Sequence, residues 1–306
     1  MNIRSVALLG AGAVGAYFMY GFTHAKNVEF CVIADGDRKD RLEKQGITIN
    51  DAVYHPPVKT PGQAKGVDLL LIATKYDSLK ESLSDIRNAA GEDTIILSLL
   101  NGVDSEEIIG TVVDPSQIIY SYMKISSQRI GSSVYFDAVK TPGLYAGEGG
   151  CHVETERLTA IRELFADLPI HYHFCEDILA DQWKKYALNI SYNLPQAILG
   201  VGVGAYNDSM HVNWLREQLE MEVRRVAAAY GITFGVLDDN PSRWLSKARF
   251  STLQDLDAGR HTEVDMFCGT LVKKAEAKGM DVPYVKYTWH MIKALEEKSD
   301  GLFDYG

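Results

Sequence analysis

The sequence predicts an α/β fold, with a Rossmann-type parallel sheet in the N-terminal domain and an all-helical C-terminal domain. Three observations support this prediction. A short apolar run at residues 6–9 leads directly into GAGAVG at residues 10–15. Apolar segments then alternate with helical segments as far as residue 100, which is typical of right-handed βαβ units. From residue 177 onward, helical periodicity dominates.

The first domain is expected to span residues 1–176. Its apolar segments show no alternation with polar residues, which is typical of parallel strands buried on both faces. After residue 120 the pattern changes, and two short strands at 134–136 and 143–146 are predicted to extend an edge of the sheet. The other expected strands are 6–9, 28–34, 47–49, 67–73 and 94–100, and the expected helices are 13–23, 40–45 and 77–90.

The second domain is expected to span residues 177–306. A chain of 306 residues is too long for one ordinary core, so two domains are expected. Glycines at 231 and 279 end two of the helical segments. The predicted helices are 178–194, 214–230, 264–278 and a last one that follows Pro283 and continues through 293.

Composition and charge limit the partners. The formal net charge of -10 argues against a nucleic-acid partner, because phosphate binding requires a basic surface. Four dispersed cysteines without a C-x-x-C pair indicate a reducing cytoplasm, and the isolated pair His171 and His173 is not expected to hold a metal. Residues 5–22 are apolar but contain several glycines, so we interpret them as strand and helix and expect no membrane segment.

The GAGAVG sequence predicts a dinucleotide site. Gly10 allows a tight turn, Gly12 lets the backbone approach a pyrophosphate, and Gly15 permits close helix packing. The helix N-terminus that follows supplies unpaired N–H groups and a favourable dipole for phosphate. The alternative is a structural strand-turn-helix without a ligand. The predicted cofactor-binding residues of the turn are Gly10, Ala11, Gly12, Ala13, Val14 and Gly15.

The end of the second predicted strand bears on the choice between NAD and NADP. Asp35 stands where a carboxylate would accept hydrogen bonds from the adenosine ribose hydroxyls and would repel a 2′-phosphate, which favours NAD. Arg38 and Lys39 follow closely and could reach such a phosphate. The residues by themselves leave both cofactors open and incline toward NAD.

Polar side chains in the second domain form a candidate reaction site. Lys185, Asn189 and Asn193 recur at every fourth position, which places them on one face of a predicted helix. The alternative is a solvated polar stripe. Further along, Ser251 begins a second polar segment, and His261 is a candidate acid–base residue.

Taken together, five motifs resemble the ketopantoate reductase family, and they occur in order across nearly the whole chain. They are GAGAVG, ATKYDSL with Lys75, Asn101-Gly102, W-x-K-x-x-x-N-x-x-x-N from Trp183, and S-x-x-x-D from Ser251 followed by R-x-T-E. The resemblance implies reduction of the 2-oxoacid 2-dehydropantoate to D-pantoate, in pantothenate biosynthesis. It also implies NADP as cofactor and is compatible with a homodimer.

The resemblance assigns roles to the second-domain residues. Lys185 would be the general acid, and Asn189, Asn193 and Ser251 would bind the substrate. Glu263 would be a catalytic residue that anchors the region where substrate and cofactor meet. His261 then becomes a neighbour of the site rather than the acid.

In the first domain, the resemblance places Asn101 where nicotinamide and substrate meet, and Lys75 near the cofactor. The sequence departs from the family pattern at three places. Asp35 replaces the usual arginine, so that NAD becomes an alternative to NADP; Val203 replaces a substrate asparagine; and residues 120–131 differ.

Two alternative functions follow. One is an NAD-dependent D-2-hydroxyacid dehydrogenase for branched or aromatic 2-oxoacids, which the changes at Asp35 and Val203 favour. The other is a non-catalytic protein that senses the nicotinamide redox state. The presence of Lys185 and its asparagines argues against the sensor, because a sensor needs none of them.

Overall fold

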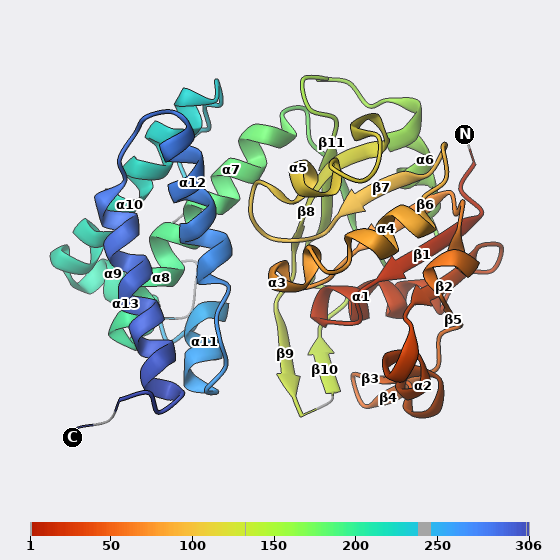
Figure 1. Ribbon diagram of the computed structural model, residues 1–306, viewed down its shortest axis with the longest axis horizontal. Coiled ribbons are helices and arrows are strands. Elements are labelled where there is room, and N and C mark those ends of the chain that lie inside the picture. The colour runs from red at the N-terminus through yellow and green to blue at the C-terminus, as the bar shows by residue number, and fades with distance from the viewer. Residues whose placement is uncertain (1, 132, 238–245, 304, 306) are drawn as a thin grey trace. The chain divides into compact units, whose positions relative to one another are not determined.

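The computed structural model describes residues 2–131, 133–237, 246–303 and 305. The chain forms two compact units, Met1–Leu179 and Ala180–Gly306. The first is an α/β unit with a mostly parallel sheet, and in the second every described element of secondary structure is a helix (Figure 1). The predicted fold class is therefore confirmed.

The first unit is built on an eight-stranded sheet. All neighbouring strands pair in parallel except β8 and β11, which are antiparallel. The order is β12-β11-β8-β7-β6-β1-β2-β5. The strands are β1 (Ser5–Leu9), β2 (Glu29–Ile33), β5 (Val58–Lys59), β6 (Leu69–Ile72), β7 (Ile95–Ser98), β8 (Ile118–Lys124), β11 (Gly143–Gly147) and β12 (Tyr172–Phe174).

The central strands are buried on both faces, as their unbroken apolar sequences predict. In β1, Val6 and Leu8 belong to one hydrophobic core, whereas Ala7 and Leu9 belong to a second core. Alternate residues of a strand point to opposite faces, so the two cores lie on opposite sides of the sheet. The helices of this unit are α1 (Ala13–Phe22), α2 (Gly36–Gln45), α3 (Tyr76–Leu79), α4 (Leu83–Ala89), α5 (Ser105–Ile109) and α6 (Glu156–Ala166), with short 3₁₀ turns η1 (Pro61–Ala64) and η2 (Pro115–Gln117).

Two predicted strands, 47–49 and 134–136, belong to a different sheet. We expected residues 134–136 to extend an edge of the main sheet, but β10 (Ser133–Phe136) lies in a separate four-stranded sheet of order β4-β3-β10-β9. Its Phe136 ring packs against the Tyr17 and Tyr20 rings of α1, with centroids 5.6 and 5.8 Å apart. This burial of an aromatic ring explains the position of β10. The other strands are β3 (Ile47–Ile49), β4 (Ala52–Tyr54) and β9 (Ser127–Ile130).

The second unit is a set of packed helices. The long helix α10 contacts both α12 and α13, and these three run side by side (Figure 1). The α-helices are α7 (Ile178–Leu188), which begins just before the unit boundary, α8 (Leu194–Leu199), α9 (Ala205–Asp208), α10 (Met210–Ala229), α11 (Ser251–Asp257), α12 (Thr270–Ala277) and α13 (Pro283–Ser299).

Two helices that the sequence predicts as continuous contain π-helical segments. The predicted helix at 178–194 is α7 followed by the π segment η3 (Asn189–Asn193), and the helix predicted at 264–278 begins with the π segment η5 (Asp265–Gly269). The two π segments contact each other. A π turn is frequently found at a functional site, and apolar periodicity does not predict it.

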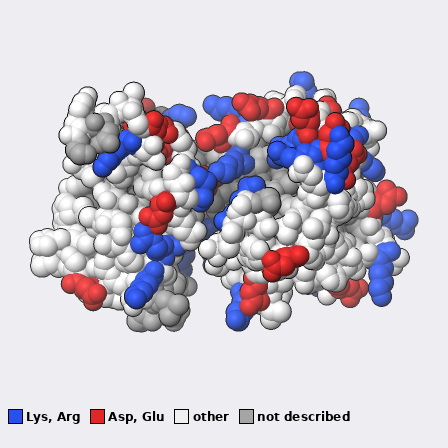
Figure 2. Space-filling view, turned by 90° about the horizontal axis from the view of Figure 1, so that it is seen from below, with Lys and Arg blue, Asp and Glu red and all other residues white. Residues whose placement is uncertain are grey.

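Charge on the face that Figure 2 shows is mixed over the first unit. Acidic and basic side chains lie next to one another over the first unit (Figure 2). Ion pairs of the first unit include Arg157 with Glu148 at 3.1 Å and Arg162 with Glu154 at 3.0 Å. Within the part of the chain that the structure describes, every helix is too short or too polar to cross a membrane.

Candidate active site

Two of the three motif glycines are required by the fold of the turn. Gly10 has a φ of +109°, and a Cβ at this position would lie 2.4 Å from the carbonyl oxygen of Ala73. A Cβ on Gly15 would lie 2.1 Å from the carbonyl oxygen of Gly10. Real contacts of this kind are far longer, so neither position accepts a side chain without movement of the backbone.

Gly12 differs from both neighbours. Its φ of -82° and ψ of -163° are open to any residue, and a Cβ there would meet no described atom within 4 Å. Gly12 is the N-cap of α1, and no side chain among the described residues caps that helix end. The unpaired N–H groups of the first turn therefore border an open space, which suits a pyrophosphate.

A residue that the sequence analysis missed lies beside the turn. The backbone nitrogen of Thr74 would be 2.7 Å from a Cβ on Gly10, so Thr74 packs against the motif. Its Oγ1 is buried and has no hydrogen-bond partner among the described residues. Buried hydroxyls are normally paired, so this atom is suited to a ligand. The only signal in the sequence is its position directly before Lys75.

Two further predicted residues follow neighbouring strands. Lys75 is the exposed N-cap residue of α3, just beyond β6, and Asn101 is half-buried just beyond β7. Since β1, β6 and β7 are parallel neighbours, their carboxyl ends share one edge of the sheet. The glycine turn, Lys75 and Asn101 are therefore brought to the edge at which α/β sheets bind ligands.

Asp35 lies at the carboxyl end of β2. Its Oδ1 accepts a hydrogen bond of 2.8 Å from the backbone nitrogen of Gly36 and thus caps α2, while the side chain is exposed. A second carboxyl, Asp85 of α4, has a raised pKa because it is partly buried and faces the charge of Asp35, although Arg38 lowers it. Two carboxylates together make this end of the strand unfavourable for a further phosphate.

The predicted polar face of α7 and η3 is partly buried. Lys185, in the last turn of α7, and Asn189 are half-buried, and Asn193 is only 4% exposed. The Nδ2 of Asn193 donates to the Oδ1 of Asn189 at 3.5 Å, while the Oδ1 of Asn193 is buried without a hydrogen-bond partner among the described residues. This burial excludes a fully solvated stripe. An unsatisfied amide oxygen inside a helical unit is a candidate contact for a substrate hydroxyl.

Gln196, which the sequence analysis also missed, positions Ser251. Gln196 of α8 is completely buried; its Nε2 donates to the carbonyl oxygen of Ala248 at 3.0 Å, and its Oε1 accepts from the nitrogen of Phe250 at 2.7 Å. Ser251, the exposed first residue of α11, follows directly. Helix α11 contacts both α8 and η3, so this amide fixes Ser251 on the element beside the asparagines.

Val203, which stands where the family pattern has a substrate asparagine, is part of the core of the second unit. Its side chain is completely buried, and its nitrogen donates to the carbonyl oxygen of Ala248 at 3.1 Å. The replacement of an asparagine by this valine removes a polar group. Because the valine side chain packs inside the unit, it does not by itself form an apolar surface for an aromatic substrate.

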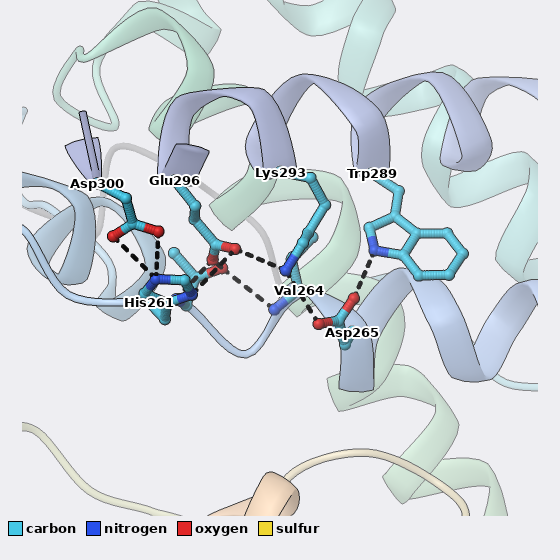
Figure 3. A network of polar contacts seen from close by, with 8 residues as sticks. His261, Val264, Asp265, Trp289, Lys293, Glu296 and Asp300 are labelled. Atoms are coloured by element: carbon cyan, nitrogen blue, oxygen red, sulfur yellow. Dashed lines mark hydrogen bonds and ion pairs between the residues drawn. The ribbon is translucent and has the colours of Figure 1, made fainter. Parts of the chain in front are cut away.

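Glu263 precedes η5 and is half-buried. The motif residues around it have structural partners: Arg260 pairs with Asp255 at 2.7 Å, which ties the segment to α11. The ring of His261 lies between two carboxylates, 3.0 Å from Asp300 and 3.6 Å from Glu296 (Figure 3). These contacts give the His261 ring two carboxylate partners, and its position relative to the reaction stays a prediction. Since η3 contacts both α11 and η5, the predicted second-domain residues lie on adjoining elements.

Comparisons with known proteins agree with these features. Residues 6–146 match the family model described as ketopantoate reductase PanE/ApbA, and residues 177–296 match the model of its C-terminal domain. The chain is similar to the 2-dehydropantoate 2-reductases of Pyrococcus horikoshii, with 25% identity over 97% of this chain and 99% of the relative, and of a Nostoc species, with 26% identity over 98% and 97%.

Solved structures show the same fold. A ternary structure of D-mandelate dehydrogenase with NADH and anilino(oxo)acetate has a TM-score of 0.82, 21% identity and coverage of 97% of this chain and 100% of that chain. A PanE/ApbA family ketopantoate reductase from Ralstonia eutropha has a TM-score of 0.79, 22% identity and the same coverage. A dimeric ketopantoate reductase from Staphylococcus aureus has a TM-score of 0.74, 22% identity and coverage of 96% and 99%.

Proposed function

The chain belongs to the ketopantoate reductase family, and from this premise we propose that it reduces 2-dehydropantoate to D-pantoate with a nicotinamide cofactor. The observation that carries the proposal is the buried, unsatisfied Oδ1 of Asn193, on the same partly buried face as Asn189 and Lys185. This arrangement suits a small polar substrate. It has no purpose in a protein that only senses a dinucleotide.

The residues of the first unit fit the cofactor. The open space at Gly12 and the N–H groups of α1 would hold the pyrophosphate, and the buried hydroxyl of Thr74 would gain a partner. Lys75 and Asn101 would lie along the bound dinucleotide. When bound, the nicotinamide supplies the hydride that reduces the 2-keto carbon.

The residues of the second unit would complete the reaction. Negative charge develops on the carbonyl oxygen as its carbon is reduced, and the Lys185 ammonium would stabilise this oxygen and donate its proton to form the hydroxyl group. Asn189, Asn193 and Ser251 would orient the substrate through uncharged hydrogen bonds. Glu263 would anchor the substrate beside the cofactor.

The test is a matrix of initial rates with NADH and NADPH against 2-dehydropantoate, 2-oxoisocaproate and phenylglyoxylate. We expect the highest kcat/KM with 2-dehydropantoate. If kcat/KM is highest with phenylglyoxylate or 2-oxoisocaproate, 2-dehydropantoate is not the preferred substrate and the D-2-hydroxyacid dehydrogenase is favoured. The likeness to D-mandelate dehydrogenase and the carboxylate at Asp35 support that alternative. No rate with any combination would favour the sensor.

We further propose that NADH is preferred over NADPH. The exposed carboxylate of Asp35 suits the ribose hydroxyls, and together with Asp85 it disfavours a 2′-phosphate. Replacing Asp35 by Ala should raise the ratio of kcat/KM for NADPH to that for NADH by about 10-fold, equivalent to about 1.4 kcal/mol. Asp37→Ala, in the same first turn of α2, is the control and should leave this ratio unchanged. An unchanged ratio in Asp35→Ala would show that Asp35 does not face the ribose.

We propose a homodimer as the assembly. Exposed apolar side chains gather on α10 and α13: Met210 is 79% exposed and Tyr287 69%, and the rings of Trp214 and Tyr284 meet at 5.7 Å. A dimeric relative of the same fold supports the proposal. Light scattering should give twice the mass of the chain, and Trp214→Glu should give a monomer. A monomeric wild type would refute the proposal.

A further inference from the structure

The last helix presents a row of polar side chains to the segment that contains Glu263. Trp289, Lys293, Glu296 and Asp300 follow one another at spacings of four, three and four residues, which places them on one face of α13 and its C-cap. Figure 3 shows all four pointing toward the segment from His261 to Asp265.

Glu296 is the centre of this row. Its side chain is 1% exposed, and its Oε1 accepts hydrogen bonds of 2.7 Å from both the backbone nitrogen and the Oγ1 of Thr262. The same Oγ1 accepts a hydrogen bond of 3.2 Å from the nitrogen of Val264. The Glu296 carboxylate therefore fixes the backbone N–H groups on both sides of Glu263. It binds that of Thr262 directly and that of Val264 through the Thr262 hydroxyl.

Lys293 links Glu296 to Asp265, at the other end of the segment. Its Nζ lies 2.9 Å from the Oε2 of Glu296 and 3.2 Å from the Oδ2 of Asp265, whose Oδ1 accepts a hydrogen bond of 2.7 Å from Trp289. Burial acts to raise the pKa of Glu296, but the ion pair with Lys293 and the hydrogen bonds from Thr262 hold it below its ordinary value. The pairing with the Glu296 carboxylate raises the pKa of Lys293, so both groups are charged at neutral pH.

Stability alone does not account for this arrangement. A buried ion pair contributes little more than well-packed apolar side chains, because removing the charges from water is costly. What the charged groups add is a defined geometry, since each hydrogen bond fixes one backbone group of a short segment. The residue at the middle of that segment is Glu263.

We propose that Glu296 is a positioning residue for the reaction, which fixes the backbone of Thr262 and Val264 and thereby aims the side chain of Glu263. The inference rests on the proposed function, in which Glu263 anchors substrate and cofactor. It adds a residue 33 positions further along the chain, on helix α13, whose effect on catalysis passes through Glu263.

The experiment compares Glu296→Gln with Glu297→Gln, the same chemical change at the adjacent exposed position of α13. We expect Glu296→Gln to lower kcat/KM about 10-fold, since small displacements of a reacting group carry large costs, and Glu297→Gln to stay within about twofold of the wild type. Thr262→Val removes only the hydroxyl that links Glu296 to Val264, and it should lower kcat/KM in the same direction even if Glu296→Gln does not fold.

A double-mutant cycle separates positioning from general stabilisation. If Glu296 acts through Glu263, then Glu263→Gln and the double variant Glu263→Gln/Glu296→Gln should have equal kcat/KM. Losses that multiply in the double variant would overturn the inference, and so would a kcat/KM for both Glu296→Gln and Thr262→Val equal to that of the wild type.

Hydrogen exchange provides a readout that does not depend on turnover. The amides of residues 262 and 264 should exchange at least 10-fold faster in Glu296→Gln, or in Thr262→Val if that variant alone folds, than in Glu297→Gln. Equal exchange would overturn the inference. A wild type without activity on any 2-oxoacid would remove the proposed function, whereas the exchange rates would still decide whether Glu296 holds the segment.

Discussion

Alanine substitutions in the glycine turn test the placement of the cofactor, because the structure gives different physical reasons for the glycines of the motif. Gly15 lacks room for a side chain within the protein, since a Cβ would lie 2.1 Å from the carbonyl oxygen of Gly10. Gly12 has open space around it and an ordinary backbone conformation. Alanine at Gly15 should therefore damage the fold, whereas alanine at Gly12 should damage only cofactor binding.

The magnitudes follow from these surroundings. Relieving a contact of 2.1 Å requires a backbone shift of roughly 1 Å, and such overpacking costs about 2–3 kcal/mol, or roughly 5–10 °C in the thermal midpoint. For Gly12→Ala, the lower entropy of the unfolded chain contributes about 0.4–1 kcal/mol of stability, and the poorer N-cap costs about 0.5–1 kcal/mol. These effects nearly cancel, so the thermal midpoint should move by less than about 2 °C.

The assay combines thermal unfolding with titration of NADH and NADPH by fluorescence. Gly12→Ala should raise the Kd of the preferred cofactor at least about 10-fold, or about 1.4 kcal/mol, because the added methyl group occupies the space assigned to the pyrophosphate. Wild-type affinity in Gly12→Ala would refute the placement of the pyrophosphate at this residue. A normal midpoint in Gly15→Ala would refute the packing argument.

The remaining predictions concern the second unit. Lys185→Ala should lower kcat by about 10²–10⁴-fold while cofactor affinity persists, and Lys184→Ala on the same helix should not; unchanged turnover in Lys185→Ala would remove this lysine from the mechanism. Asn193→Leu should raise the KM for 2-dehydropantoate about 10-fold or more with an unchanged cofactor Kd, since a buried amide would be lost, and a normal KM would exclude its contact with substrate. Because the pKa of Glu296 is lowered in the fold, its ionisation stabilises the fold above the unfolded pKa of about 4.3, and this stabilisation is lost as the pH falls through the folded pKa. In urea titrations between pH 3 and 7, the free energy of unfolding should therefore fall less steeply toward acid pH for Glu296→Gln than for the wild type. The same pH dependence in both proteins would contradict this assignment.

Local sequence patterns were sufficient for the parallel sheet and most of its helices. Unbroken apolar runs such as 69–72 require burial on both faces, which a parallel sheet covered by helices provides. Local patterns were insufficient where packing against a residue distant in the sequence decides which sheet a strand joins. Strand β10 has the apolar side chains of an edge strand, but it joins a second sheet because Phe136 packs on α1.

For the site, motifs identified the residue types and their order, and their roles remain predictions. The residues that hold them in place were not predictable, because each acts through a distant backbone group. Gln196 bonds to Ala248 and Phe250, and Glu296 bonds to Thr262, across separations of 34 to 54 residues. A buried amide or carboxylate in an otherwise ordinary helix leaves no pattern that distinguishes it from an exposed one.

The sequence by itself determined the βαβ order, the dinucleotide turn and the family, because these depend on local periodicity, on glycines at fixed spacing and on motifs in order. Only the tertiary structure decided why each glycine is required, that the buried Oδ1 of Asn193 has no partner among the described residues, and that π turns occur at Asn189–Asn193 and shortly after Glu263. The physical reason is that burial, close approach and hydrogen-bond satisfaction are properties of neighbours in space, which the chain brings together only when it folds.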